Sequence, residues 1–180
     1  MSFDAFCYSK SHSKESVDIG GIPGETQDED YAAKGAFEIT SFDIGAMNNI
    51  NIGSTSGGGG AGKASFKEFI VTKKTDSAST GLFYGLVTGK HYQDLTVELR
   101  RSGESATKSG GVFMKFDFVL VMVQDINWSG VSGSDSLDET VTFQFGAIEI
   151  TYKQQGHKGQ MEKDKVVRWS RVKNNASLTV

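Results

Sequence analysis

The segment VTFQFGAIEITY, residues 141–152, alternates apolar and polar residues, as a β-strand with one buried face does. Its apolar residues occupy odd positions before Gly146 and even positions after it. Since a pattern of period two changes phase when a residue is inserted, we expect a bulge or a barrel corner at Gly146. The segment therefore predicts a strongly curved β-sheet.

Other segments predict further strands. Leu95, Val97 and Leu99 alternate with polar residues, which indicates one wet face. Residues 113–123 are apolar on both faces apart from Lys115 and Asp117, so we expect the central strand there, with one face on the core and the other on a second layer or subunit. Residues 37–44 repeat the phase change near Thr40. A last strand is expected at 166–172. With 22 glycines and one proline, the chain favours strands joined by glycine turns.

A glycine-rich segment, GGGGAGKA at residues 57–64, matches the phosphate-binding loop pattern except at its last position. There Ala64 lacks the hydroxyl that holds Mg²⁺. The motif also needs a helix after it, whereas ASFKEFIVTKK follows and predicts a strand. We expect a long surface loop over residues 48–63 and no nucleotide site; a nucleotide-binding enzyme stays as a distant alternative.

One helix is expected, from about Ser79 to Thr88. Asp76 or Ser77 caps its start, and Gly89 ends it, followed by Lys90 and His91 at the negative end of the helix dipole. Its apolar residues recur at helical spacing at Leu82, Phe83, Leu86 and Val87. We expect this short helix to pack on the sheet.

Length and charge limit the class of protein. The 180 residues suit a single domain over 1–180, with a C-terminal extension from about residue 154. A net charge of -3 disfavours a binder of nucleic acids. The longest apolar run, residues 118–123, is too short to span a bilayer, and the N-terminus lacks the features of a secretory signal. We expect a soluble protein.

Residues that carry chemistry are few. The histidines are His12, His91 and His157, with no pair at metal-binding spacing, and Cys7 is the one cysteine. The acidic loop with Asp135, Asp138 and Glu139 lacks the spacing of a calcium site and predicts a solvated loop. We expect no catalytic residue, no cofactor and no metal.

The order of these features resembles the haemolysin-coregulated protein (Hcp) family, the tube proteins of bacterial type VI secretion. The matching segments are FDAF at 3–6, IPGET at 22–26, the glycine loop, DSASTGLFYGLVTGKH at 76–91, LTVELRRSG at 95–103 and VTFQFGAIEITYKQQ at 141–155. The Gly89-Lys90-His91 junction and the strand ending at Arg100-Arg101 are the most specific. The chain departs from the family at Thr80, where members commonly have proline, and in an apparent insertion at residues 9–18.

The resemblance implies a small β-barrel of two sheets with one flanking helix, assembling into a hexameric ring. Such rings stack head to tail into a tube that a contractile sheath expels, with effectors in its lumen. Implied partners are other copies of the chain, a VgrG-like spike at the tube tip, the sheath and baseplate, and the effectors. The tube subunit would assemble in the bacterial cytoplasm and be secreted without a signal peptide. The alternative is a free-standing secreted effector or binding protein of the same fold that does not polymerise.

Three sets of site residues follow from this resemblance. The glycine loop would stack one ring on the next, through Gly57, Gly58, Gly59, Gly60 and Lys63. The two-sided apolar strands would meet a neighbouring subunit, through Phe113, Phe116, Phe118, Phe143 and Phe145. The polar face of the strand at 95–101 would line the lumen and hold cargo, through Thr96, Glu98 and Arg100.

Overall fold

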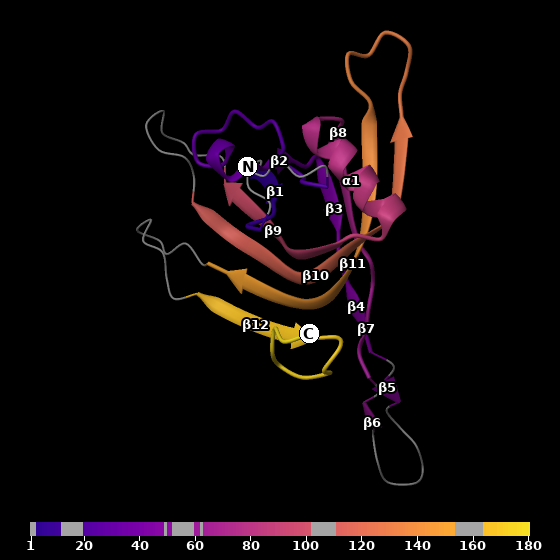
Figure 1. Cartoon of the computed structure of the whole chain (residues 1–180). Coiled ribbons are helices and arrows are strands. Elements are labelled where there is room, and N and C mark those ends of the chain that lie inside the picture. Colours follow the sequence, from indigo (N-terminus) through magenta and orange to yellow (C-terminus); the bar gives the residue numbers. More distant parts are fainter. Residues whose placement is uncertain are drawn as a thin grey trace.

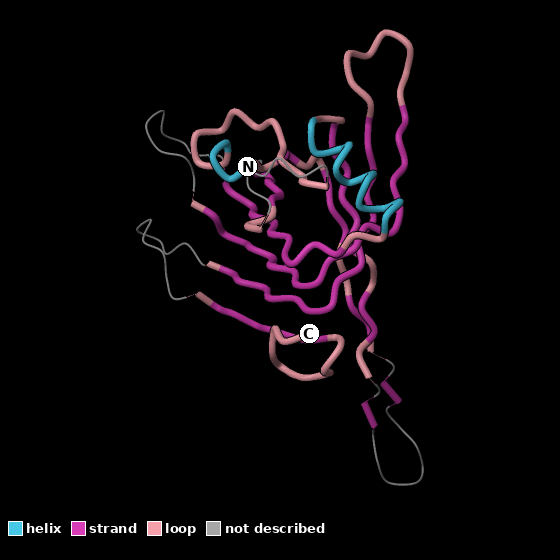
Figure 2. The backbone as a smooth tube through the Cα atoms, viewed as in Figure 1, coloured by secondary structure: helices cyan, strands magenta, loops and turns pink. Residues whose placement is uncertain are grey.

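A computed structural model describes residues 3–11, 20–48, 50–51, 60–61, 63–101, 111–153 and 164–180. Figures 1 and 2 show a sharply curled sheet, one helix against its side, a narrow arm at the bottom and a tall hairpin at the top. The elements are β1 (Phe3–Tyr8), the 3-10 helix η1 (Ala32–Lys34), β2 (Phe37–Glu38), β3 (Ser41–Asp43), β4 (Ala46–Met47), β5 (Ile50–Asn51), β6 (Gly60–Ala61), β7 (Ser65–Phe66), β8 (Phe69–Lys74), α1 (Ser77–Thr88), β9 (His91–Arg101), β10 (Val112–Ser129), β11 (Asp138–Tyr152) and β12 (Lys165–Ser170).

The main sheet has eight strands, in the order β2-β1-β9-β10-β11-β8-β3, with β12 also paired to β11. Each neighbouring pair is antiparallel. The prediction of a mainly β fold with one flanking helix is confirmed, and β10, built on the two-sided apolar segment, lies at the centre of the sheet. The expected last strand is present as β12, where Trp169 pairs with Ile148.

The sheet bends at the pair of facing residues Leu120 and Gly146. In β10 the buried residues are Phe116 and Phe118 before this point and Val121 and Val123 after it, and β11 changes phase at the same place. The pairing register is the same on both sides, so of the two expected alternatives at Gly146 the corner is present and the bulge is not; a register shift lies between Val123 and Asp125. Leu120 has a φ of 55°, in the left-handed region. This backbone conformation exchanges the two faces of the strand, so that buried positions change from even to odd without an inserted residue. We call this place the crease.

The crease divides the sheet into two wings that enclose the core. The first wing holds β1, most of β9, residues 112–119 of β10, residues 147–152 of β11, and β12; the second holds the rest of β10 and β11 with β8 and β3. Aromatic rings pack between the wings: the ring centre of Phe69 in the second wing lies 4.5 Å from that of Phe118 in the first. The two expected sheets of the barrel are thus the wings of one folded sheet.

Residues 37–43 connect the free edges of the two wings. β2 pairs with β1 and β3 pairs with β8, so consecutive residues reach opposite edges. Ile39 donates its N–H to the Ala5 carbonyl at 3.0 Å, and Thr40 donates to the Thr72 carbonyl at 2.8 Å. The predicted phase change near Thr40 marks this crossing, which closes the barrel at one end.

The helix α1 begins two residues earlier than expected and ends as expected. Asp76 caps it by accepting from the Ala78 N–H at 3.0 Å, Ser79 completes the capping box, and Gly89 ends it with a φ of 65°. The buried face consists largely of small residues around Leu82, whereas Phe83 and Val87 of the predicted apolar stripe are exposed. Within the described ranges, no helix is long and apolar enough to cross a membrane.

The glycine-rich segment leaves the second wing as an arm. At its foot β4 pairs with β7, and farther out β5 pairs with β6 (Figure 1). A strand follows the segment rather than a helix, as predicted, so the phosphate loop lacks its helix. Residues 52–59 and 62 of the arm, which include the predicted stacking glycines 57–59, lie outside the described residues, as do most of residues 9–21, 102–111 and 154–165.

We predict that Gly81→Ala destabilises the fold. A Cβ on Gly81 would lie 1.7 Å from the Gly21 carbonyl oxygen, because the helix rests directly on the backbone of that loop. Relief of such a clash requires backbone movement and costs about 1–3 kcal/mol in free energy of unfolding, measurable by urea denaturation. Thr80→Ala, at the exposed neighbouring position, is the control and should change this free energy by less than about 0.5 kcal/mol. Equal stability of both variants would contradict the close packing of α1.

Candidate functional site

The phenylalanines expected at the subunit interface lie mostly inside the subunit. Phe116, Phe118, Phe143 and Phe145 are each at most 5% exposed and belong to the core between the wings. The side chains of Phe116, Phe118 and Phe143 therefore have almost no surface to offer a neighbour, which corrects the expectation for these three. Phe145 is almost as buried, but it also lines the pocket described below. Phe113 is partly exposed, and its contact with a neighbouring subunit stays a prediction.

The polar face of β9 is covered by residues of the segment before β2. Glu98 accepts hydrogen bonds from Tyr8 at 3.0 Å and Tyr31 at 2.8 Å, and Lys34 lies 3.3 Å away. Burial, together with the Glu98 carboxylate, raises the pKa of both tyrosines, so they remain donors. The result is a buried carboxylate held by two phenols.

Arg100, beside Glu98 on the same strand face, is enclosed by acidic groups. Its guanidinium donates to Asp28 and to Asp30 (3.2 Å), reaches Asp4, and lies over the rings of Phe6 and Tyr31. The hydrogen bond from Arg100 holds the pKa of Asp28 below its usual range. These contacts fasten the loop before β2 onto the sheet.

Thr96, the third residue of this face, donates to Asp117 at 2.7 Å. Burial alone would raise the pKa of Asp117, but hydrogen bonds from Lys10, Lys115 and Thr96 hold it below its usual value. All three residues expected to line the lumen are thus buried. They do not form the open wet face that the sequence suggested, because residues 28–34 and the end of β1 cover them; charge reversal at Glu98 or Arg100 would disturb the fold.

The acidic loop is only partly solvated. Asp135 is exposed and Asp138 pairs with Lys74 at the surface, as expected, but Glu139 is fully buried. It accepts from the Trp128 indole N–H at 2.7 Å and lies 3.7 Å from Lys73, which is also fully buried and bound to Asp76 and Ser79. This polar cluster joins the hairpin of β10 and β11 to the start of α1.

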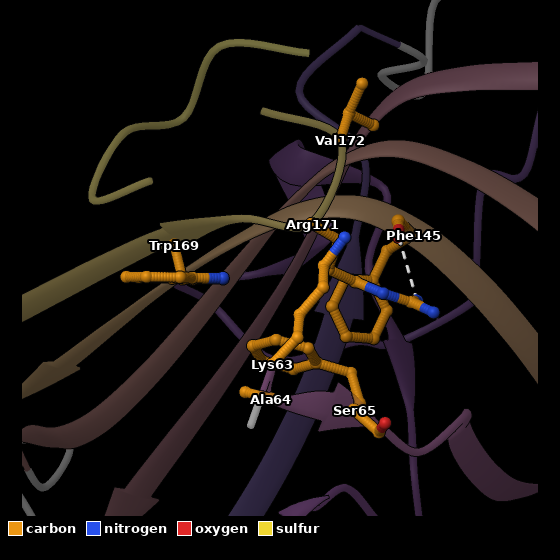
Figure 3. A pocket seen from close by; sticks show the side chains of 8 residues that line it. Lys63, Ala64, Ser65, Phe145, Trp169, Arg171 and Val172 are labelled. Atoms are coloured by element: carbon orange, nitrogen blue, oxygen red, sulfur yellow. Dashed lines mark hydrogen bonds between the residues drawn. The ribbon is translucent and has the colours of Figure 1, made fainter. Parts of the chain in front are cut away.

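A pocket lies at the foot of the arm, where β7 meets the end of β12 (Figure 3). It has a volume of about 520 Å³ and is lined by Lys63, Ala64, Ser65, Phe66, Phe145, Trp169, Arg171 and Val172. Lys63 is the one predicted stacking residue whose side chain the structure describes. Sequence reasoning missed Arg171, since only folding brings it beside the arm.

Arg171 gives the pocket its charge. Its Nη1 donates to the Phe145 carbonyl at 2.9 Å and to Gln144 at 3.1 Å, and the guanidinium lies 4.8 Å from the centre of the Phe145 ring (Figure 3). Burial lowers the pKa of Arg171. Lys63 adds a second cation, and none of the described residues that line the pocket is acidic. Such a site suits an anionic group with apolar neighbours.

Candidate chemical groups elsewhere are dispersed. Cys7 lies in the core, and burial raises the pKa of its thiol. His91 is the first residue of β9 and is exposed, whereas His12 and His157 lie outside the described residues. Among the residues that the structure describes, no three His, Cys, Asp or Glu side chains are grouped to hold a metal ion.

Comparison with known proteins gives the family. The model of the family described as "Type VI secretion system effector, Hcp" matches residues 17–152, which is more than half of the chain. The chain belongs to the Hcp family. Protein hcp1 of Pseudomonas aeruginosa is 25% identical to this Hcp chain over 93 residues, which cover 52% of this chain and 56% of that protein. This match thus spans little more than half the length of the curated relative.

Solved structures share the fold over almost the whole Hcp chain. One described as the structure of a type six secretion system protein has a TM-score of 0.80 at 26% identity and covers 98% of this chain and 100% of its own. The crystal structure of Hcp1 from Salmonella typhimurium has a TM-score of 0.73 at 22% identity over the same shares. The resemblance drawn from the sequence is therefore confirmed for family and fold.

We predict that acid unfolds this Hcp chain partly through Asp28 and Asp117. Both pKa values are lowered in the fold, so their contribution to stability is present above the unfolded carboxyl pKa of about 3.9 and is lost as the pH falls below it. Thermal unfolding between pH 7 and pH 2.5 should show this loss. Asp117→Asn should be less stable at pH 7 and show a smaller drop in acid; an unchanged pH profile would exclude Asp117 as a source.

Proposed function

We propose that this Hcp family member is the structural subunit of a type VI secretion tube. In this proposal hexameric rings stack head to tail, a contractile sheath expels the tube, and effectors travel in the lumen. The observation that carries the proposal is the family match over residues 17–152, supported by the similarity of the whole fold to a type six secretion system protein. The role requires no catalysis and no cofactor.

The shape of the subunit supports a head-to-tail polymer. The arm joins the second wing at the start of β8, and the end of β8 pairs with the start of β11, at the base of the β10–β11 hairpin. The arm and the hairpin tip therefore project from opposite ends of the paired strands β8 and β11 (Figure 1). A subunit whose two ends differ can repeat by translation along that direction. In a ring, the same direction would become the tube axis.

Exposed apolar side chains support contacts around a ring. One group, on α1 and the hairpin, contains Phe83, Tyr84, Val87 and Trp128; another, on β12 and after it, contains Val166, Val167 and Val172. The two groups lie on different sides of the molecule (Figure 1). Closed rings use two different patches of each subunit, and exposed apolar patches commonly mark interfaces. These groups replace the buried phenylalanines as candidate ring contacts.

The proposed partners are other copies of the chain, a VgrG-like spike, the sheath and baseplate, and the effectors in the lumen. Assembly in the cytoplasm followed by expulsion would need no signal peptide. Since the polar face of β9 is buried, we expect cargo to contact other residues of the inner surface through several weak contacts around the ring.

A free-standing secreted protein is the second candidate. The description of the family uses the word effector, and an effector of this fold could act without polymerising. The two candidates differ in one measurable property, because only the tube subunit needs to form rings.

We predict that the purified chain forms hexamers. Sedimentation velocity at micromolar concentration should show a species six times the mass of the 19.4 kDa chain, and electron microscopy should show rings. A chain that remains at 19.4 kDa over this range would favour the free-standing candidate.

We predict that deletion of residues 57–60 prevents tubes but leaves the subunit folded. The four glycines at 57–60 lose much conformational entropy when they are ordered, unless a partner holds them, so this segment should contribute more to a contact between rings than to the fold. The thermal midpoint and the hexamer should be preserved while stacking is lost. Tubes of normal length from the deletion variant would assign the segment a linker role only.

A further inference from the structure

The tip of the β10–β11 hairpin and the pocket at the foot of the arm are complementary in charge and in apolar character. The tip comprises the eight residues 130–137 between the two strands. It presents Val131, which is 80% exposed, Leu137, which is 45% exposed, and the exposed carboxylate of Asp135. The pocket presents Lys63 and Arg171 beside Phe66, Phe145 and Trp169.

The tip is an ordered knob. Ser134 donates its N–H to the Val131 carbonyl at 3.1 Å, which closes a turn, and Gly133 at its third position has a φ of 94°, as a type II turn requires. At the base, Leu137 exchanges hydrogen bonds with Thr75, and Asp138 pairs with Lys74 at 2.7 Å. An ordered knob loses little conformational entropy on docking.

The pocket keeps free donors for an anion. Within the described part of the chain, the side-chain hydrogen bonds of Arg171 use only Nη1, so the N–H groups of Nη2 and Nε remain. Burial removes water from the Arg171 guanidinium, which lowers its pKa. A carboxylate that entered the pocket would replace the lost water with charge-assisted hydrogen bonds. The aromatic walls supply contact area for branched aliphatic side chains.

We propose that the hairpin tip of one copy inserts into the arm-foot pocket of a second copy, with Asp135 meeting Lys63 and Arg171 while Val131 packs on the aromatic walls. The occupant cannot be the tip of the same copy, because β7 and the end of β12, whose residues line the pocket, lie far from the hairpin tip (Figure 1). A contact between two different ends repeats without closing and so builds a filament. The inference rests on the proposed tube and names the contact between its rings.

The test uses charge exchange in the full chain. Asp135→Lys replaces the attraction to both cations by repulsion, Lys63→Glu reverses the charge of one of the two cations, and the double variant restores opposite charges between positions 63 and 135. Both residues are exposed, so the fold and the hexamer should survive. Lys67→Glu, at an exposed lysine that does not line the pocket, is the matched control.

Ring mass is measured first by sedimentation, and stacking is then measured as the protein concentration needed for tubes. Each single variant should raise that concentration by at least about tenfold, because repeated contacts act together in each junction between rings. The double variant should recover most of the loss, and the control should match the original chain. High salt should weaken stacking of the original chain, since exposed ion pairs are screened.

Several outcomes would overturn the contact. Single variants that stack normally, or a double variant no better than the singles, exclude the pairing of Asp135 with the pocket while leaving the tube in place. A loss of hexamers rather than of stacking would place the contact within a ring. An original chain that forms no rings would overturn the tube proposal and this inference with it.

A covalent trap gives an independent measurement. Ser65→Cys in the pocket combined with Ser136→Cys in the tip should produce a ladder of disulfide-linked chains under oxidation, whereas either change alone should not. Cys7 is fully buried and should not react. Absence of the ladder from oxidised tubes of the double variant would contradict insertion of the tip.

Discussion

The contact between Leu120 and Gly146 in the middle of the two longest strands sets the shape of the subunit. A Cβ on Gly146 would come within 3.2 Å of the Leu120 side chain, so the glycine makes room for a leucine that holds a left-handed backbone. Because both strands turn over at the same place, pairing continues across the bend. The sheet can therefore fold into two wings with a shared core, and β11 pairs with β8 in one wing and with β12 in the other.

Polar groups are buried on both wings, where other segments of the chain cover them. Residues 20–36 cross the face of the first wing, where Glu98 and Arg100 would otherwise project into solvent, and the buried charges are paired by Tyr31, Lys34 and Asp28. On the second wing, Lys73 and Glu139 join α1 to the hairpin. Breaking a buried pair leaves an uncompensated charge, which is more costly than the pair is stabilising. These clusters hold the loop and the hairpin in fixed positions relative to the sheet.

Sequence periodicity predicted the elements well and their outer surfaces poorly. A cap at Asp76 or Ser77, the C-terminal glycine of α1, the central strand and the place of the bend all depend on local residues, and each was predicted. The bulge is absent because a left-handed Leu120 shifts the phase without an insertion. The lumen residues expected on β9 are buried for a different reason. Alternation in β9 shows that one face is polar, but it cannot show that Tyr31 and Asp28, about seventy positions earlier in the chain, cover that face.

The same limit applies to the arm-foot pocket, which is built from three segments distant in sequence. Lys63 drew notice only through its glycine-rich surroundings, whereas Arg171 and Trp169 stood in the expected last strand, 166–172, whose pattern gives no sign of a site. The fold brings them together because β12 pairs with β11 just past the crease, placing the end of β12 beside Phe145 and β7. A cationic pocket beside the arm and an acidic knob at the far end of the paired strands β8 and β11 give the subunit polarity. Polarity of this kind requires both ends to be fixed to one sheet, and here the arm is joined to it through β8 and the hairpin through β10 and β11.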